Sequence, residues 1–342
     1  MIPRVLQLMW RHTAAMAACM SLLGWGEASS AICTARLAPP RVATNDLTVT
    51  YFGVTTLMIS DGDERLLVDG FFSRPRTRPL ITGRIGSDSK AVRDGLGEGQ
   101  PPILAILTAH AHHDHALDVA AVATIETSTI TLGTPSVARL VEGQGAPPER
   151  ICVAQEGQRV QLGAYAVTAF YTPHGPSPFF LRWLLDHPLQ RPIPSRAWFG
   201  RFKDDRNLSF LIEYGSRRVL VIPSAGLNTL ARLDADTVFL GIGRLGKMSD
   251  ADASAYLRGA VSPKTRTLVP IHWDRFTTPL FNPLKPSPRV LDDVAAGIEA
   301  VCDFAKNRSE MAVLRIDAGG TLTLPLNGTA IGSENVDEPC RR

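Results

Sequence analysis

The sequence has little cysteine, few aromatic residues and almost no excess charge. Of its 342 residues only 5 are cysteine and 7% are aromatic, and 36 Lys and Arg stand against 33 Asp and Glu. So few cysteines exclude a disulfide scaffold, and no basic stripe with interleaved aromatics is present, which argues against a nucleic-acid partner. No apolar run reaches the roughly 20 residues of a membrane-spanning helix. The length allows one large domain or two small ones.

The N-terminus has the order of a secretory signal. Arg4 and Arg11 precede an apolar run over residues 13–25, and small residues follow at 28–31. A positive region, an apolar region of about 7 to 15 residues and a small-residue cleavage site define such signals. We therefore expect a cleaved signal peptide over residues 1–31 and an exported protein, periplasmic or secreted. An uncleaved signal that anchors the chain to a membrane is the alternative.

Four cysteines would remain after cleavage: Cys33, Cys152, Cys302 and Cys340. In an oxidising compartment four thiols allow three sets of disulfides, and sequence alone does not choose among them. Cys302 lies four residues after Ile298 on an expected helical stripe, so it fits a buried free thiol as well as a bridge. We expect the terminal pair, Cys33 with Cys340, to form a disulfide.

The chain is expected to hold one folded domain over residues 47–326, after a linker at 32–46 and before a flexible tail at 327–342. Strand-like runs alternate with helical patterns along this domain. Residues 179–202 stand apart because they are aromatic, basic and broken by three prolines. They are interpreted as an insertion packed over the edge of the core, or alternatively as a mobile lid or a membrane-surface contact.

Local signals predict two helices and one long loop. Ser249 is suited to cap a helix, and Ser287 with Pro288 is expected to open another helix whose Val290 faces inward. Residues 74–102 show little periodicity and are predicted to form a long surface loop.

The most informative stretch is a histidine cluster that follows an apolar strand predicted at residues 103–107. Four histidines and one aspartate fall within six residues, HAHHDH. Packing so many ionisable groups together is costly without a compensating charge, so the cluster predicts a metal site. Two more histidines, in TPHG and PIHWD, also follow strand-like runs and would meet the cluster at one edge of a sheet. The candidate ligands are His110, His112, Asp114, His115, His174 and His272.

This stretch resembles the HxHxDH motif of the metallo-β-lactamase superfamily, and the resemblance extends over residues 47–326. Asp69 in LLVDG matches the acid that ends an early strand in that family, and His174 and His272 match its later histidines. The resemblance implies an α/β (α+β) fold, a four-layer αββα sandwich with metals at one edge between the sheets. The stretches TYFGVTTLMI, LLVDG, FLGIG and PIHWD look most like the lactonase-type branch, which includes ascorbate-phosphate lactonase.

The resemblance further implies two Zn²⁺ sites. The ligands of the first would be His110, His112 and His174, and those of the second Asp114, His115 and His272. Asp69 would lie behind one of these ligands and fix it or its turn. Ser224 stands where many members of the superfamily carry an aspartate that bridges both metals. We therefore expect the second zinc to be held less tightly.

Zinc lowers the pKa of bound water to about 7. The resemblance therefore implies an exported hydrolase that uses a metal-bound hydroxide on a lactone, lactam or other ester-like bond of a small molecule. Asp114 and Asp69 are the candidate catalytic residues, and Asp114 would orient the hydroxide. Candidate substrate contacts flank the motifs. These are Ser224, Trp273, Phe71, Phe72 and Phe276, with Arg74, Arg76 and Arg78 for an anionic group if they are not simply a solvated basic loop.

Two other functions remain open at this point. The first is an iron-dependent oxygenase on the same fold, which would more naturally use two histidines and one carboxylate. The second is a metal-binding protein without turnover.

Overall fold

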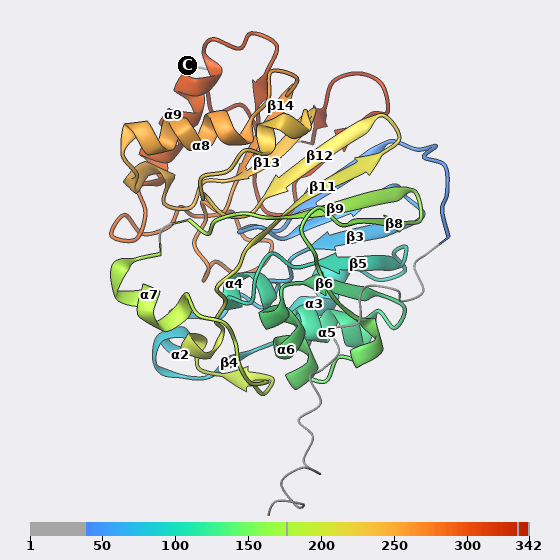
Figure 1. Ribbon diagram of the computed structural model, residues 1–342, viewed down its shortest axis with the longest axis vertical. Coiled ribbons are helices and arrows are strands. Elements are labelled where there is room, and N and C mark those ends of the chain that lie inside the picture. The colour runs from blue at the N-terminus through green and yellow to red at the C-terminus, as the bar shows by residue number, and fades with distance from the viewer. Residues whose placement is uncertain (1–38, 176, 334, 341–342) are drawn as a thin grey trace, which may run out of the picture. The chain divides into compact units, whose positions relative to one another are not determined.

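The chain forms two β-sheets that lie face to face, with helices on their outer faces (Figure 1). The computed structural model describes residues 39–175, 177–333 and 335–340. The predicted signal peptide and Cys33 lie outside these residues. Within the part of the chain that is described, no helix is long and apolar enough to cross a membrane.

The first sheet has an antiparallel half and a parallel half. Its strands, in spatial order, are β18 (Ile331–Gly332), β17 (Thr321–Leu324), β1 (Leu47–Tyr51), β2 (Leu57–Ser60), β3 (Arg65–Val68), β5 (Ile103–Leu107), β6 (Ile130–Gly133) and β7 (Ile151–Val153). Pairing is antiparallel from β18 to β3 and parallel from β3 to β7. The carboxyl ends of β3 and β5 therefore lie at the same edge of the sheet.

The second sheet is built in the same way. Its strands, in spatial order, are β15 (Ala312–Val313), β14 (Thr267–Ile271), β13 (Thr237–Gly241), β12 (Arg217–Ile222), β11 (Leu208–Tyr214), β9 (Tyr165–Tyr171) and β8 (Arg159–Leu162). Strands β12 to β15 are parallel, and β8, β9, β11 and β12 are antiparallel. Two short pairs complete the sheets: β4 (Ile85–Gly86) with β10 (Arg196–Ala197), and β16 (Arg315–Ile316) with β19 (Val336–Asp337).

Strand alternation explains the layers. In β12, Val219 and Val221 pack into the core between the two sheets, whereas Leu220 and Ile222 pack under the outer helices. Successive side chains of a strand point to opposite faces, and a strand buried on both faces is read as a continuous apolar run. The run VLVI is therefore what a central strand of a four-layer fold requires.

Helices cover both outer faces. Helices α3 (Ser89–Leu96), α5 (Val119–Ile125) and α6 (Pro135–Gly143) cover the first sheet, and α8 (Asp250–Ala260) and α9 (Val294–Ala305) cover the second (Figure 1). Ser249 caps α8 as predicted, since its side chain accepts a hydrogen bond from the Asp252 amide. The expected four-layer αββα sandwich is confirmed.

The disulfide prediction was wrong. Cys302, on α9, is bonded to Cys340, and their Cα atoms are 5.2 Å apart. The pairing ties the end of the chain to the outer helical layer, where Cys340 packs against the core under α9. This bond also bears on the predicted flexible tail at 327–342. Its described part is held by the β18 and β19 pairings as well as by the disulfide.

Two further expectations are corrected. The predicted loop at residues 74–102 contains α2 (Thr77–Thr82), β4 and α3, and Asp88 caps α3 by accepting from two backbone amides. Helix α9 begins at Val294 with Asp293 as its cap, and Val290 is 86% exposed and does not face inward. The competing cap, Asp293, decides where this helix starts.

Candidate metal centre

The histidine cluster lies where β5 ends, at the edge of the first sheet. The strand leads directly into the loop, and the short helix α4 (His113–Ala116) follows. The loop is held by backbone contacts, because the Ala109 amide donates to Asp69 Oδ1 at 2.7 Å and the Leu208 amide to the Ala109 carbonyl at 3.0 Å. The loop is therefore hydrogen-bonded both to Asp69, which follows β3 of the first sheet, and to Leu208, which begins β11 of the second sheet.

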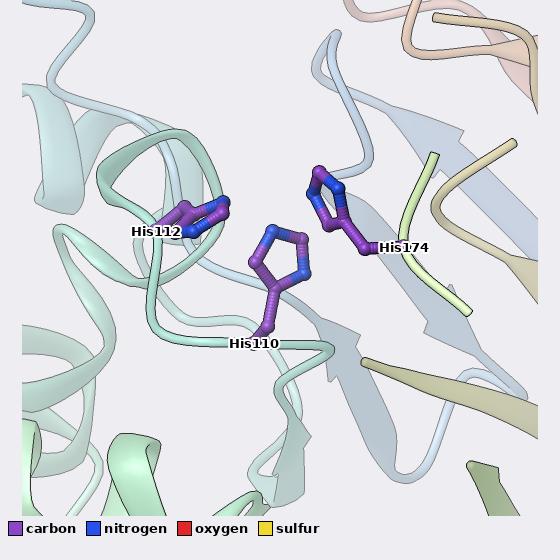
Figure 2. A group of neighbouring side chains, drawn as sticks. All are labelled: His110, His112 and His174. Atoms are coloured by element: carbon purple, nitrogen blue, oxygen red, sulfur yellow. The ribbon is translucent and has the colours of Figure 1, made fainter. Parts of the chain in front are cut away.

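The first group of ligating side chains comprises His110, His112 and His174, whose rings converge from two loops (Figure 2). Their ligating atoms all lie within 4.8 Å of one another. His110 Nδ1 lies 3.0 Å from Asn207 Oδ1, and its Nε2 is buried without any partner. An orphaned buried ring nitrogen is costly unless a further group binds it. The His110 site therefore fits a metal ion.

His112 is oriented by a residue of the insertion. Its Nε2 lies 3.3 Å from the Leu185 carbonyl, at the end of α7 (Phe179–Leu185). A carbonyl accepts only, so Nε2 carries the proton and Nδ1 keeps its lone pair. Such a hydrogen bond to the second ring nitrogen is the usual way in which a ligating histidine is oriented.

The second group comprises Asp114, His115 and His272. His115 Nε2 lies 3.2 Å from His272 Nε2, and Asp114 Oδ2 lies 3.5 Å and 3.4 Å from these two nitrogens. In a tetrahedral zinc site with bonds of 2.0 to 2.1 Å, neighbouring ligand atoms are about 3.3 Å apart. The three atoms thus have the mutual spacing of one face of such a tetrahedron.

The rings of the first group are kept neutral. Burial holds the pKa of His110 well below its ordinary value and lowers the pKa of His112 to about 3. The residue His174 is exposed, but its ring packs against those of His110 and His112, and its pKa is lowered as well. Asp114 behaves in the opposite sense. Burial opposes its ionisation, but the neighbouring histidines hold the pKa of Asp114 well below its usual range. Neutral imidazoles and an ionised carboxylate are the protonation states that bind metals.

Asp69 supports the second group from behind. It is fully buried, its Oδ2 accepts from His115 Nδ1 at 2.8 Å, and it also accepts from the Thr55 hydroxyl. The proton of His115 is thereby fixed on Nδ1, so that Nε2 faces His272 with its lone pair. Asp69 therefore positions His115 and has no exposed atom with which to touch a substrate.

Asp274 performs a similar task for His272, and sequence reasoning missed it. The His272 amide donates to the Val54 carbonyl at 2.6 Å, and Asp274 accepts from the Val54 amide at 2.6 Å. His272 has φ of 61°, a left-handed conformation that needs such support in a residue other than glycine. The only signal in the sequence was an acid two residues beyond a candidate ligand. Asn207 and Leu185, which orient His110 and His112, carried no such signal.

Ser224 holds the loop of the third histidine. Its hydroxyl accepts from the Gly175 amide at 2.8 Å, directly after His174, and the residue is 7% exposed. At the position where many members of the superfamily carry a bridging carboxylate, this chain has a neutral hydroxyl that fixes a neighbouring backbone.

One large cavity, of about 740 Å³, opens over the candidate centre. Members of both groups line it: His112 and His174 from the first, Asp114 and His272 from the second. Ser224 is at its wall. The remaining lining is largely apolar, with Leu80, Ile81, Leu181, Leu185, Phe199 and Phe276.

Not every predicted substrate contact reaches this cavity. Phe276 lines it, but Trp273 packs into the core under α8 and α9 and borders a different pocket. Phe71 is fully buried against His113, which lies outside both ligand groups. Arg74 is also buried and forms an ion pair with Asp274, so it is neither a substrate contact nor part of a solvated loop. Apolar packing draws the aromatic residues inward, and a buried acid draws in the arginine.

Comparisons with known proteins point to one family. A family model described as the beta-lactamase superfamily domain matches residues 64–273, a range that includes all six candidate metal ligands. No curated protein sequence matches significantly. Among solved structures, a metallo hydrolase from Ignicoccus hospitalis is 13% identical, covering 82% of this chain and 99% of its own, with a TM-score of 0.52. An isothiocyanate hydrolase from Delia radicum gut bacteria is 14% identical, covering 81% and 99%, with a TM-score of 0.50.

Proposed function

The chain belongs to the β-lactamase superfamily of metal-dependent hydrolases, and we propose that it is an exported zinc enzyme that cleaves a lactone, lactam or other ester-like bond in an apolar small molecule. One observation carries this proposal. Two groups of candidate ligating side chains lie next to each other, and both contribute members to the wall of a single cavity. A metal there would meet any molecule that enters the cavity.

A zinc ion held by these residues would supply a water of lowered pKa and would polarise the bond under attack. The residues of the protein would orient the reacting water. Asp114 stays ionised at ordinary pH and is held by His115 and His272 on one side, while its Oδ1 lies 3.8 Å from His113 Nδ1. This fixed carboxylate can orient a reacting water by accepting its proton in a hydrogen bond. The apolar walls would displace water around a bound substrate, which would strengthen electrostatic interactions at the site.

The substrate class and the compartment rest on further features. The cavity wall favours an apolar substrate, because burial of apolar surface drives most small-molecule binding. The lactonase-type branch is proposed from the sequence stretches that resemble it. Export is supported by the order of residues 1–31 and by the Cys302 disulfide, since such bonds persist in oxidising compartments.

A second candidate function has one observation in its favour. The group of Asp114, His115 and His272 is a set of two histidines and one carboxylate, which also suits non-haem iron. Iron at this group would redirect the proposal to an oxygenase.

The metal content of the full chain, purified without chelator, tests these alternatives. We expect up to two zinc ions per chain, with loss of one in His110→Ala and loss of the other in His272→Ala. The exposed His187 offers a matched control, since His187→Ala should change nothing. Zinc-loaded protein would then be assayed on lactones, lactams and esters of increasing chain length. Predominant iron would favour the oxygenase, and no metal after zinc addition would overturn the proposal.

A further inference from the structure

Two segments distant in sequence meet at the mouth of the cavity. Residues 76–86 contain α2 and β4, and residues 179–203 contain α7 and β10. They are joined by the β4–β10 pairing and by a hydrogen bond of 3.3 Å from Trp198 Nε1 to the Ile81 carbonyl. Figure 1 shows α2, α7 and β4 gathered at one corner of the fold. We call the exposed side of these two segments the rim surface.

The rim surface carries charge of one sign. The two segments together contain seven arginines, all exposed, and a single acidic residue, Asp186. Of these seven arginines, only Arg182 has an ion-pair partner among the residues that the structure describes, which is Asp186 at 4.0 Å. The whole chain is almost neutral, so this local excess is a property of the surface. The arginines are Arg76, Arg78, Arg84, Arg182, Arg191, Arg196 and Arg201.

Large apolar side chains are exposed among these arginines. Trp183 on α7 is 71% exposed, Ile81 on α2 is 59% exposed and Trp198 is 40% exposed. Val290 and Leu291 are 86% and 43% exposed, and Leu291 also lines the cavity. Exposed tryptophan costs free energy in water unless a partner covers it. Tryptophan together with arginine is the combination that suits the boundary between a bilayer and water.

The exposed apolar residues continue into the cavity. Ile81 belongs both to the rim surface and to the cavity wall. On α7, Leu181 and Leu185 line the cavity, whereas Arg182 and Trp183 face solvent. An apolar path therefore runs from the rim surface to His112 and Asp114.

We propose that the rim surface docks onto an anionic lipid layer, so that the cavity opens toward the lipid and takes in molecules dissolved there. The arginines would meet the lipid phosphates, and Trp183, Trp198 and Ile81 would enter the interface between head groups and chains. The docking itself stands on the surface alone. The further step, in which a lipophilic ester or lactone drawn from that layer is the substrate, rests on the proposed hydrolase function.

Hydrogen exchange of the full chain with lipid vesicles tests the docking locally. This readout is needed because the apolar run at residues 13–25 could bind lipid by itself. With phosphatidylglycerol vesicles at physiological salt we expect slower exchange in α2 and α7, and no change in α8. Phosphatidylcholine vesicles or 1 M salt should abolish most of this protection, because the attraction is electrostatic.

Variants make the test specific. The double variant Arg182→Ser, Arg191→Ser should need about thirtyfold more lipid to reach the same protection of α2 and α7. Trp183→Ser should need severalfold more lipid. The matched control is the double variant Arg258→Ser, Lys264→Ser, which removes the same charge from the exposed outer side of the second sheet. It should leave the protection of α2 and α7 unchanged. Equal protection in both double variants would overturn the proposal. So would protection that grows with protein concentration without lipid, which would indicate self-association.

The result of the docking test can be distinguished from the result of the test for hydrolase activity. Vesicle protection requires no turnover, so docking can hold while no ester or lactone is cleaved. If hydrolysis is found in solution but is no faster with phosphatidylglycerol vesicles, the proposed hydrolase stands, and the exchange data alone decide whether the docking occurs.

Discussion

Arg74 and Asp274 form a buried ion pair, with Nη1 of the arginine 2.9 Å from Oδ2 of the aspartate. Both side chains are almost inaccessible to solvent, and the aspartate also accepts from the Tyr51 hydroxyl and the Val54 amide. The pair thus links the β1–β2 turn to the turn that carries His272. This buried ion pair therefore stabilises the turn that places His272 in the candidate metal centre.

Removing the arginine should destabilise the fold strongly. In Arg74→Met the carboxylate of Asp274 stays buried without its cation, which we expect to lower the free energy of unfolding by about 3 to 5 kcal/mol. Chemical denaturation measures this change. Arg78→Met is the matched control, because Arg78 is exposed, and it should stay within about 0.5 kcal/mol of the wild type. Similar values for the two variants would contradict the structural role of the pair.

Asp69→Asn should weaken metal binding without touching a ligand. The amide cannot accept from His115 Nδ1 as strongly as the carboxylate does, so the ring loses its fixed proton and orientation. We expect about 10- to 100-fold lower metal affinity, measured by competition with a chelating dye. The exposed Asp205→Asn serves as control. Unchanged affinity in Asp69→Asn would refute the positioning role.

Asp114→Asn should preserve the fold and abolish most turnover. The residue keeps its shape but loses the charge that faces His115 and His272. On a substrate found in the panel of esters and lactones we expect the rate constant to fall by orders of magnitude, with an unchanged circular dichroism spectrum. A variant of near-normal activity would remove Asp114 from the mechanism.

Ser224→Asp should tighten the second metal. Ser224 lines the cavity between the two ligand groups' loops and presents a neutral hydroxyl there. A carboxylate at this position would add an anionic oxygen ligand, while it could still accept from the Gly175 amide. At limiting zinc we expect more metal per chain in Ser224→Asp and no gain in Ser224→Ala. If both variants bind equally, the residue does not control occupancy.

Asp204 should give the apoprotein a pH-dependent stability. Burial raises the pKa of this carboxyl to about 6, although it accepts from the Ala111 amide at 2.9 Å. Because the folded pKa lies above the unfolded value, the folded state holds more protons between about pH 4 and 6, and this contribution to stability falls as pH rises through 6. Denaturation of chelator-treated wild type and Asp204→Asn across pH 4 to 7 isolates it. Parallel curves would contradict the raised pKa.

Sequence reasoning reached the fold through patterns of short range. The HAHHDH stretch, the strands around it and the Ser249 cap are each local, and the structure has them as predicted. The prediction was wrong where two local signals competed. Ser287 with Pro288 was expected to open the last helix, but α9 begins at Val294, and the side chain of Asp293 accepts a hydrogen bond from the Ala296 amide. Only the folded structure shows which of the two candidate caps is used.

Contacts between distant segments could not be predicted in this way. The partner of Cys340, the burial of Arg74 and the carbonyl of Leu185 behind His112 all join residues far apart in the chain. None of the three has a periodic or motif signal, since each depends on how the two sheets and the insertion pack together. The same holds for the rim surface, whose two segments are about 100 residues apart.

The sequence by itself determined which side chains are available for metal chemistry, because six ligand-type residues follow apolar strands and strand ends converge at one sheet edge. Only the tertiary structure decided how they divide into two groups, which nitrogen of each ring is free, and what the cavity above them is made of. These properties depend on hydrogen bonds and burial contributed by other elements, such as Asp69, Asn207 and α7. A linear pattern carries no information on those contacts.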